Sequence, residues 1–305
     1  MIDYNKFCSI LNGHIFEGEK RELLRKIADN PNRFIGLFRP TKPEAKILQN
    51  ILQSHEIRFG DAMEELISEF LKDWGFKILP KQIIPNPAKS KNKLVIDHYF
   101  TDGRTYYFIE QKIRDDHDSS KKRGQIDNFE AKLEYLYKNH QQNLVGIMYF
   151  IDPDLIKNKN YYDNELKKMK NIYGVELYLF YGKELFKFFN RGYDWDNLIS
   201  WLTKWKMGLP DLPEINFDND PESSFNDIKN LEISVWRKIL ENNRLWEEGI
   251  MLSIFKSGET LKMISEHYEK KQGKAYKKIA GMIKQKLQAY YKHQYSANNR
   301  VEVQD

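Results

Sequence analysis

The period of the hydrophobic pattern changes near Gly75, and this change constrains the fold more than any other feature of the sequence. Before it, residues 60–74 carry apolar side chains at helical spacing. After it come short runs rich in aromatic and β-branched residues, which predict strands at 76–79, 94–100, 105–112, 144–151 and 175–181. Apolar stripes predict helices at 126–137 and 161–173. This order predicts an α/β fold whose mixed sheet begins antiparallel, continues with parallel crossovers and is flanked by helices.

The rest of the chain is predicted to be helical. Residues 1–58 form an N-terminal helical segment, with amphipathic stretches at 19–27 and 44–52 on either side of Pro40 and Pro43. The core is predicted to span 59–213. Residues 214–227 contain five acidic residues and no Lys or Arg, which indicates an acidic linker. Residues 228–305 then form an all-helical, basic C-terminal domain.

Composition excludes several classes of protein. An apolar content of 41% is typical of a folded chain, while the longest apolar runs, such as Val145–Ile151, are shorter than the roughly 20 residues of a membrane span. The first twenty residues lack an apolar signal-peptide core, so we expect a cytoplasmic protein that does not associate with membranes. The single cysteine, Cys8, excludes an internal disulfide.

The segments KLVIDHYF and TYYFIEQK, joined by TDGR, predict a β-hairpin with a two-residue Asp102-Gly103 turn. Thr101 would then pair with Arg104, and Asp97 would lie opposite Phe108. Side chains alternate between the faces of a strand, so Asp97, Glu110 and Lys112 are expected on one face, with the two carboxylates roughly 7–8 Å apart on a diagonal.

Two carboxylates at that spacing can share one hard divalent ion such as Mg²⁺, with the backbone carbonyl of Gln111 as a further ligand. Cleavage of a phosphodiester needs an activated water and stabilisation of the charge that develops on phosphorus, and a metal site with a lysine beside it provides both. Lys112 would orient or deprotonate the water. The same residues could instead lie idle on a sheet by chance, but the apolar strand before Glu110 argues against a wet face.

An Asp at a strand end, a short hairpin and Glu110-Gln111-Lys112 on the next strand resemble the PD-(D/E)XK nucleases. The run EQKIRDDHDSSKKRGQ, within a chain of 305 residues, further resembles type II restriction endonucleases. The resemblance covers about residues 60–181, and it departs from the motif at Ile96, which stands where Pro is usual. It implies Mg²⁺-dependent hydrolysis of double-stranded DNA by Asp97, Glu110 and Lys112, and a homodimer that cuts both strands of a symmetric site.

Many nucleases of this superfamily also place a Glu on the helix before the first core strand. Glu64 lies on the border of that helix's apolar stripe, whereas Glu65 points away from it. Glu64 is therefore the better candidate for a fourth metal ligand, although it could equally be a solvated border residue.

The loop after the third strand is expected to face a DNA groove. Lys121, Lys122 and Arg123 would contact phosphates, and Gln125 or Asn128 would lie near bases. Asp115, Asp116 and Asp118 nearby are expected to be solvated or to cap a turn rather than to bind metal.

Two helices at 260–270 and 273–291, joined by a tight break, predict a helix-turn-helix-like end. From residue 265 to 300 nine Lys or Arg stand against two Glu. On the second helix one face is apolar and the opposite face is rich in Lys and Gln; its candidate phosphate contacts are Lys274, Lys277, Lys278 and Lys284. That face either docks on DNA or is simply solvated.

Other chemistries find little support, because the chain has no G-x-x-x-x-G-K-[ST], G-x-S-x-G or H-E-x-x-H motif. Two alternatives to a restriction enzyme stay open. One is another nuclease of the same superfamily, acting in DNA repair or junction cleavage. The other is a non-catalytic helix-turn-helix DNA-binding protein, which would need no alignment of Asp97, Glu110 and Lys112.

Overall fold

The computed structural model describes residues 2–38, 40–83 and 94–298, with side chains to residue 291. The chain divides into two compact units. The sheet unit contains residues 1–14 and 58–209, and the helical unit contains residues 15–57 and 210–305. Arg300 and the side chain of Lys292, which contribute to the predicted basic end, lie outside the described part.

The sheet unit is built on a five-stranded mixed sheet in the order β1-β4-β5-β6-β7. Its strands are β1 (Lys77–Ile78), β4 (His98–Thr101), β5 (Tyr106–Lys112), β6 (Leu144–Phe150) and β7 (Glu176–Tyr181). β1, β4 and β5 pair antiparallel, and β5, β6 and β7 pair parallel. The predicted mixed α/β fold with a helical C-terminal region is confirmed. A separate short hairpin joins β2 (Gln82–Ile83) to β3 (Leu94–Val95).

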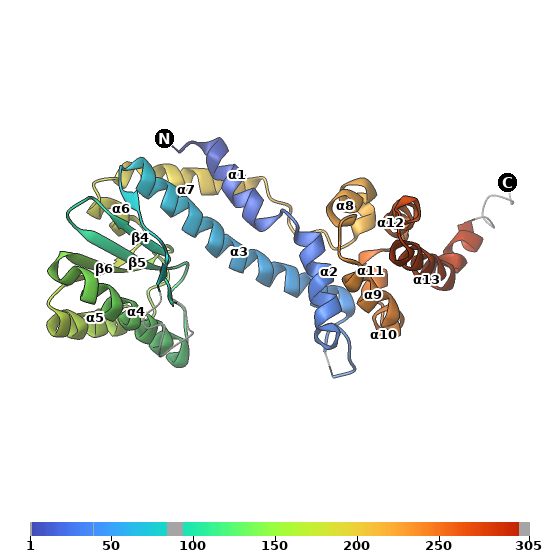
Figure 1. Ribbon diagram of the computed structural model, residues 1–305, viewed down its shortest axis with the longest axis horizontal. Helices are drawn as coiled ribbons and strands as arrows, with labels where there is room; N and C mark the ends of the chain where they lie inside the picture. Colours follow the sequence, from blue (N-terminus) through green and yellow to red (C-terminus); the bar gives the residue numbers. More distant parts are fainter. Residues whose placement is uncertain (1, 39, 84–93, 299–305) are drawn as a thin grey trace. The chain divides into compact units, whose positions relative to one another are not determined.

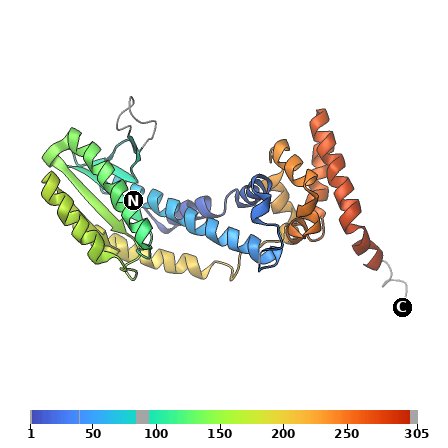
Figure 2. The same ribbon diagram turned by 90° about the horizontal axis from the view of Figure 1, so that it is seen from below.

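Helices cover both faces of the sheet (Figure 1; Figure 2). α4 (Ser119–His140) and α5 (Lys159–Tyr173) pack on the face that carries Phe108, whose ring lies 4.9 Å from that of Phe129. Gly146 on β6 lies beneath this contact, where an added Cβ would come within 2.7 Å of the Phe108 ring. The opposite face meets α3 (Pro43–Asp73), through Ser68. α1 (Tyr4–Ile15), α6 (Lys183–Phe188) and α7 (Gly192–Met207) complete the unit.

The amphipathic stretch at 44–52 and the helix at 60–74 are both helical, and a single helix, α3, runs unbroken through them. In the first half of α3, Ile47 and Ile51 are buried in the core of the helical unit. In the second half, Leu66 and Phe70 are buried and belong to the sheet unit. Gly60 lies inside this helix and does not end it, since helical neighbours on both sides outweigh its modest cost of about 1 kcal/mol.

The helical unit also contains α2 (Glu19–Asp29) and the η1 turn (Pro31–Arg33). Towards the C-terminus it contains the η3 turn (Phe217–Asn219), α8 (Pro221–Ile228), α9 (Ile233–Glu241), α10 (Asn243–Glu247), α11 (Ile250–Ile254), α12 (Glu259–Lys270) and α13 (Lys274–Asn298). One core of apolar side chains joins α2 and the start of α3 to these C-terminal helices, with Trp236 and Trp246 fully buried in it.

This division differs from the predicted one in two places. Residues 15–57 pack with the C-terminal helices instead of standing apart as an N-terminal segment. Residues 214–227, predicted to be a linker, contain the η3 turn and most of α8. Their acidic side chains accept backbone N–H groups at helix starts: Asp218 binds Thr260 at 2.8 Å, and Asp220 caps α8 through Ser223. Phe217 is buried in the core of the helical unit.

Candidate active site

The hairpin of β4 and β5 brings three predicted residues together, but in a different register from the predicted one. Thr101 pairs with Tyr106, not with Arg104, so that residues 102–105 form a four-residue loop. Asp102 stabilises this longer loop by accepting the N–H groups of Arg104 and Thr105 at 2.8 and 2.7 Å. The slip is two residues, an even number, so every side chain keeps its predicted face. Continued by one residue, the register brings Asp97 level with Glu110.

Three oxygen atoms surround the ammonium of Lys112. Its Nζ lies 2.9 Å from Oε1 of Glu110, 2.8 Å from the backbone oxygen of Gln111 and 3.4 Å from Oδ2 of Asp97. Asp97 is fixed by a second contact, since its Oδ2 accepts the backbone N–H of Gln111 at 2.7 Å. The strand parity predicted from the sequence therefore produces one compact cluster.

The charge of Lys112 is set by this cluster. Burial lowers its pKa, but attraction to Glu110 and Asp97 outweighs burial, and the pKa is raised above the usual value. Lys112 is therefore protonated at neutral pH in this arrangement. Such a group neutralises negative charge and positions a water molecule more readily than it accepts a proton.

The same three oxygens form a donor set that suits a hard divalent cation. Two carboxylates and a backbone carbonyl are the ligand types that Mg²⁺ uses, with water completing its shell. The ammonium of Lys112 occupies the point where they converge. Within the described residues no three His, Cys, Asp or Glu side chains gather closely enough to hold a metal by themselves. The carbonyl of Gln111 is thus part of the set.

Glu110 is buried, and two side chains of α4 hold it. Asn128 donates to Oε1 at 3.2 Å, and the ammonium of Lys132 contacts Oε2. Sequence reasoning placed Asn128 near bases and missed Lys132. The signal for Lys132 was present, because it follows Phe129 by three residues and precedes Leu136 by four, on the buried stripe of the helix.

A hydrogen-bonded row lies on the opposite face of the same strands. The Nδ1 atom of His98 lies 3.0 Å from the Ser68 hydroxyl, and its Nε2 lies 2.9 Å from Oε1 of Gln111. Complete burial lowers the pKa of His98 to about 3, so the imidazole is neutral. Because an amide oxygen only accepts, His98 donates from Nε2, and the Ser68 hydroxyl donates to Nδ1. No sequence motif indicated this row. It holds the side chain of Gln111 on the face opposite the charged cluster.

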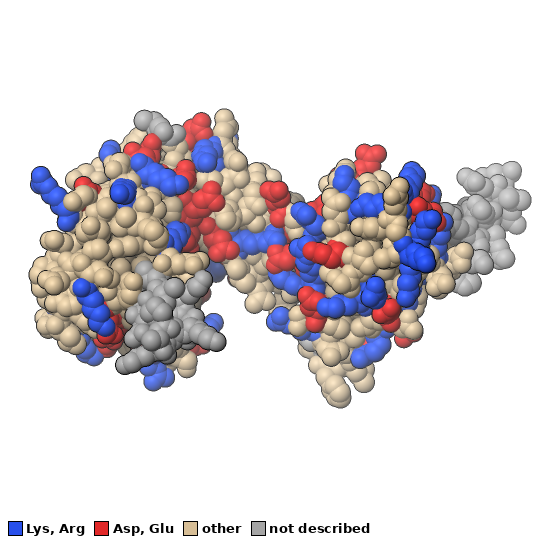
Figure 3. Space-filling view, viewed as in Figure 1, with Lys and Arg blue, Asp and Glu red and all other residues tan. Residues whose placement is uncertain are grey.

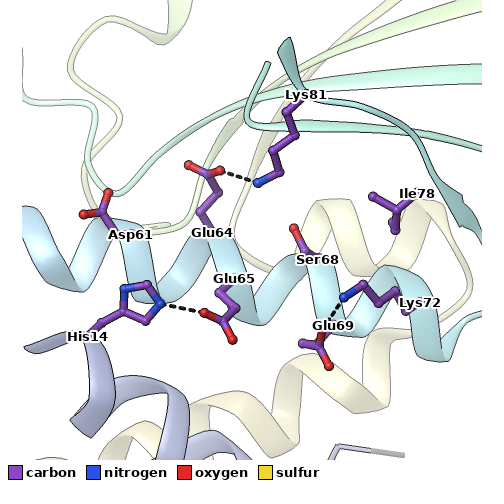
Figure 4. A pocket seen from close by; sticks show the side chains of 9 residues that line it. All are labelled: His14, Asp61, Glu64, Glu65, Ser68, Glu69, Lys72, Ile78 and Lys81. Atoms are coloured by element: carbon purple, nitrogen blue, oxygen red, sulfur yellow. Dashed lines mark hydrogen bonds and ion pairs between the residues drawn. The ribbon is translucent and has the colours of Figure 1, made fainter. Parts of the chain in front are cut away.

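Glu64 points into a pocket of about 440 Å³ between α1, α3 and the segment after β1 (Figure 4). It forms an ion pair with Lys81, and Glu65 pairs instead with His14. Burial raises the pKa of Glu64 in spite of Lys81, and repulsion from Asp97 adds to this. Glu65 lines the same pocket but binds His14. The role of Glu64 as a metal ligand stays a prediction.

The expected groove-facing loop is helical at Lys121, Lys122 and Arg123, which form the first turns of α4. Asp118 starts the helix early by capping the N–H groups of Ser120 and Lys121. Lys121 and Arg123 are exposed, and the ammonium of Lys122 lies 4.5 Å from the centre of the Tyr161 ring.

Two neighbouring polar residues are already engaged. Gln125 accepts a hydrogen bond from Tyr162, and Asp115 is fully buried, where it accepts from Asn158 and Tyr181. Asp115 is therefore part of the core rather than a solvated loop residue.

In the helical unit, α13 has the predicted two faces. Ile279, Ala280 and Ile283 are buried, while the four candidate lysines are exposed. Lys284 pairs with Glu269 at 2.6 Å. Among the described residues Lys274, Lys277 and Lys278 have no ion-pair partner. Figure 3 shows Lys and Arg gathered over the helices near the C-terminus.

None of the helices in the part of the chain that the structure describes combines the length and apolar character of a membrane span.

Comparison with known proteins gave one family. A model described as "Type II restriction endonuclease, HinfI" matches residues 3–84 and 76–206, about two-thirds of the chain. No curated protein matches the chain. The matched residues include Asp97, Glu110, Lys112 and Lys132.

Proposed function

The chain belongs to the HinfI family of type II restriction endonucleases, site-specific deoxyribonucleases that act on DNA, and we propose that its cleavage depends on Mg²⁺ and on Asp97, Glu110 and Lys112. The observation that carries this proposal is that two carboxylates and the Gln111 carbonyl converge on one point. Their oxygens lie 2.8–3.4 Å from the ammonium of Lys112, which is at that point. The alternative of a binding protein without activity needs no such cluster.

In this proposal Asp97, Glu110 and the carbonyl of Gln111 hold the divalent ion. When bound, the ion lowers the pKa of a coordinated water and neutralises phosphate charge. Lys112 leaves its position among the oxygens and turns to the attacking water and the scissile phosphate, whose developing negative charge it stabilises. Its side chain, 30% exposed, can reach solvent and a bound strand. Asn128 and Lys132 keep Glu110 in place, and Glu64 is a further candidate ligand.

Lys121, Lys122 and Arg123 are proposed to contact DNA phosphates, with Gln125 at the edge of this surface. Lys274, Lys277, Lys278 and Lys284 are proposed to do the same from α13. The active form is proposed to be a homodimer, since a double-strand cut at a symmetric site uses two copies of one active site.

The test is digestion of a plasmid of known sequence with Mg²⁺. Discrete fragments support a restriction enzyme, and structure-dependent nicking supports a repair or junction nuclease. An intact plasmid in a shifted gel band would show a binding protein and would contradict the proposal. Asp97→Ala, Glu110→Ala and Lys112→Ala should each abolish cleavage and leave binding in Ca²⁺ intact.

A further inference from the structure

Glu110 carries its carboxylate inside the protein, with only 2% of the residue exposed. A buried carboxylate is costly unless hydrogen bonds and opposite charge compensate it. In this protein three groups compensate the carboxylate of Glu110. The ammoniums of Lys112 and Lys132 provide the charge, and the amide of Asn128 provides a further hydrogen bond.

The two carboxylate oxygens of Glu110 have different partners. Oε2 meets Lys132, whereas Oε1 meets Lys112 and Asn128. Oε1 is thus the oxygen that faces the convergence point with Asp97 and Gln111. Oε2 points the other way, into the contact between β5 and α4.

The two lysines also differ in how far their side chains are exposed to solvent. The side chain of Lys132 is 3% exposed and that of Lys112 is 30% exposed. Lys132 rises from the apolar stripe of α4, between Phe129 and Leu133, which are both fully buried. Packing on both sides fixes its direction, so it cannot reach a DNA strand. Lys112 thus has solvent into which its side chain can turn, whereas Lys132 is enclosed.

We propose that Lys132 is a positioning residue for DNA cleavage: it holds one oxygen of Glu110 so that the other stays directed at the cation site. This inference rests on the proposed function of Glu110 as a metal ligand. Lys132 also keeps a compensating charge beside Glu110 at the moment when Lys112 leaves. Groups that hold a ligand in this way typically change metal affinity or activity by roughly 10–100-fold when removed.

The test compares Lys132→Met, which keeps length and loses charge, with Lys138→Met on the exposed side of α4. Lys138 is 67% exposed and pairs only with Glu134 in the described structure. Three quantities are measured: the thermal midpoint of the metal-free protein, Ca²⁺ affinity of the protein–DNA complex by calorimetry, and the Mg²⁺ concentration for half-maximal cleavage. Lys132→Met should bind Ca²⁺ roughly 10–100-fold more weakly and need correspondingly more Mg²⁺, while Lys138→Met should match wild type.

Wild-type Ca²⁺ affinity and Mg²⁺ dependence in folded Lys132→Met would overturn the proposal, and so would a loss of cleavage with unchanged Ca²⁺ affinity. If Lys132→Met does not fold, Lys132→Gln, which keeps a donor, is judged by the same measurements. Glu110→Gln separates the role of Lys132 from the proposed function. Wild-type cleavage by Glu110→Gln would contradict the proposed function itself, whereas an inactive Glu110→Gln beside an unaffected Lys132→Met would overturn only the role of Lys132.

Discussion

At the scale of single residues, the two faces of β5 support the candidate site in different ways. Glu110 and Lys112 project towards α4 and form the charged cluster, while Gln111 projects towards α3 and joins His98. The backbone of Gln111 connects the two, because its N–H binds Asp97 and its carbonyl binds Lys112. The neutral, buried imidazole of His98 thus contacts the candidate site through the side chain of Gln111.

His98 should make the stability of the folded protein depend on pH. Its pKa is about 3 in the folded state and near 6.5 when unfolded. Below pH 6.5 the unfolded chain binds a proton that the folded chain does not, so stability present at pH 7.5 is lost as the pH falls towards 3. Between pH 7.5 and 5 this loss should be about 2 kcal/mol. Urea unfolding in EDTA at both pH values measures it.

His98→Gln should remove this part of the pH dependence, because an amide does not titrate. His14→Gln, which changes a partly exposed imidazole elsewhere in the sheet unit, is the control. Equal pH dependence in wild type and His98→Gln would show that His98 is not held neutral by burial.

The residue cluster was partly predictable for a specific physical reason. Asp97, Glu110 and Lys112 lie on adjacent antiparallel strands, and strand parity survives a slip of two residues. Lys132 was not predicted, since it reaches Glu110 through the packing of α4, 22 residues along the chain. Contacts of this kind depend on how a crossover helix is rotated on the sheet, and no local pattern in the strands encodes that rotation.

At the scale of elements, helix faces and most strands followed from periodicity, whereas helix limits did not. The predicted strand at 94–100 is divided between β3 and β4, which belong to different sheets. The stripes of α4, α5 and α13 are buried as predicted. α3 joins two stretches that were predicted from separate apolar patterns, and α4 begins at an Asp118 cap where the pattern indicates a loop. Caps and long-range packing decide where a helix ends, and they outweigh the weak propensity of one glycine.

The basic face of α13 should bind DNA through phosphate charge alone. Removal of one lysine–phosphate interaction should reduce the slope of log affinity against log salt by about 0.9. Replacing Lys274, Lys277, Lys278 and Lys284 with Gln should therefore flatten the slope by up to about 3–4, with the greatest weakening of binding at low salt. A salt titration of DNA binding in Ca²⁺ measures this, and cutting at low salt and saturating enzyme should persist.

The matched control removes equal charge elsewhere. Lys138, Lys167, Lys168 and Lys170 on α4 and α5 are all exposed and all in ion pairs, and their replacement by Gln should leave the slope nearly unchanged. Identical slopes for wild type and the α13 variant would leave that helix as a solvated surface. The phosphate-binding role would then pass to Lys121–Arg123.

At the scale of the whole molecule, the family match gives the activity, site-specific cleavage of DNA, but not the number of protomers that act on one site. A symmetric site with both strands cut requires two active sites related by a two-fold axis. We expect two protomers on each recognition site in sedimentation of the Ca²⁺-stabilised DNA complex. One protomer per site with both strands cut would contradict the homodimer.

The central claim is that Glu110 and its neighbours hold the metal that makes the enzyme cut DNA. Its most direct test is a single-turnover reaction started by adding Mg²⁺ to preformed protein–DNA complexes in EDTA. Wild type and Glu134→Gln, which changes an exposed glutamate of α4, should cleave at the same rate. Glu110→Gln should bind the DNA and leave it uncut at every Mg²⁺ concentration, having lost an anionic ligand. Cleavage by Glu110→Gln at the wild-type rate, or by wild type while EDTA remains in excess, would contradict the account.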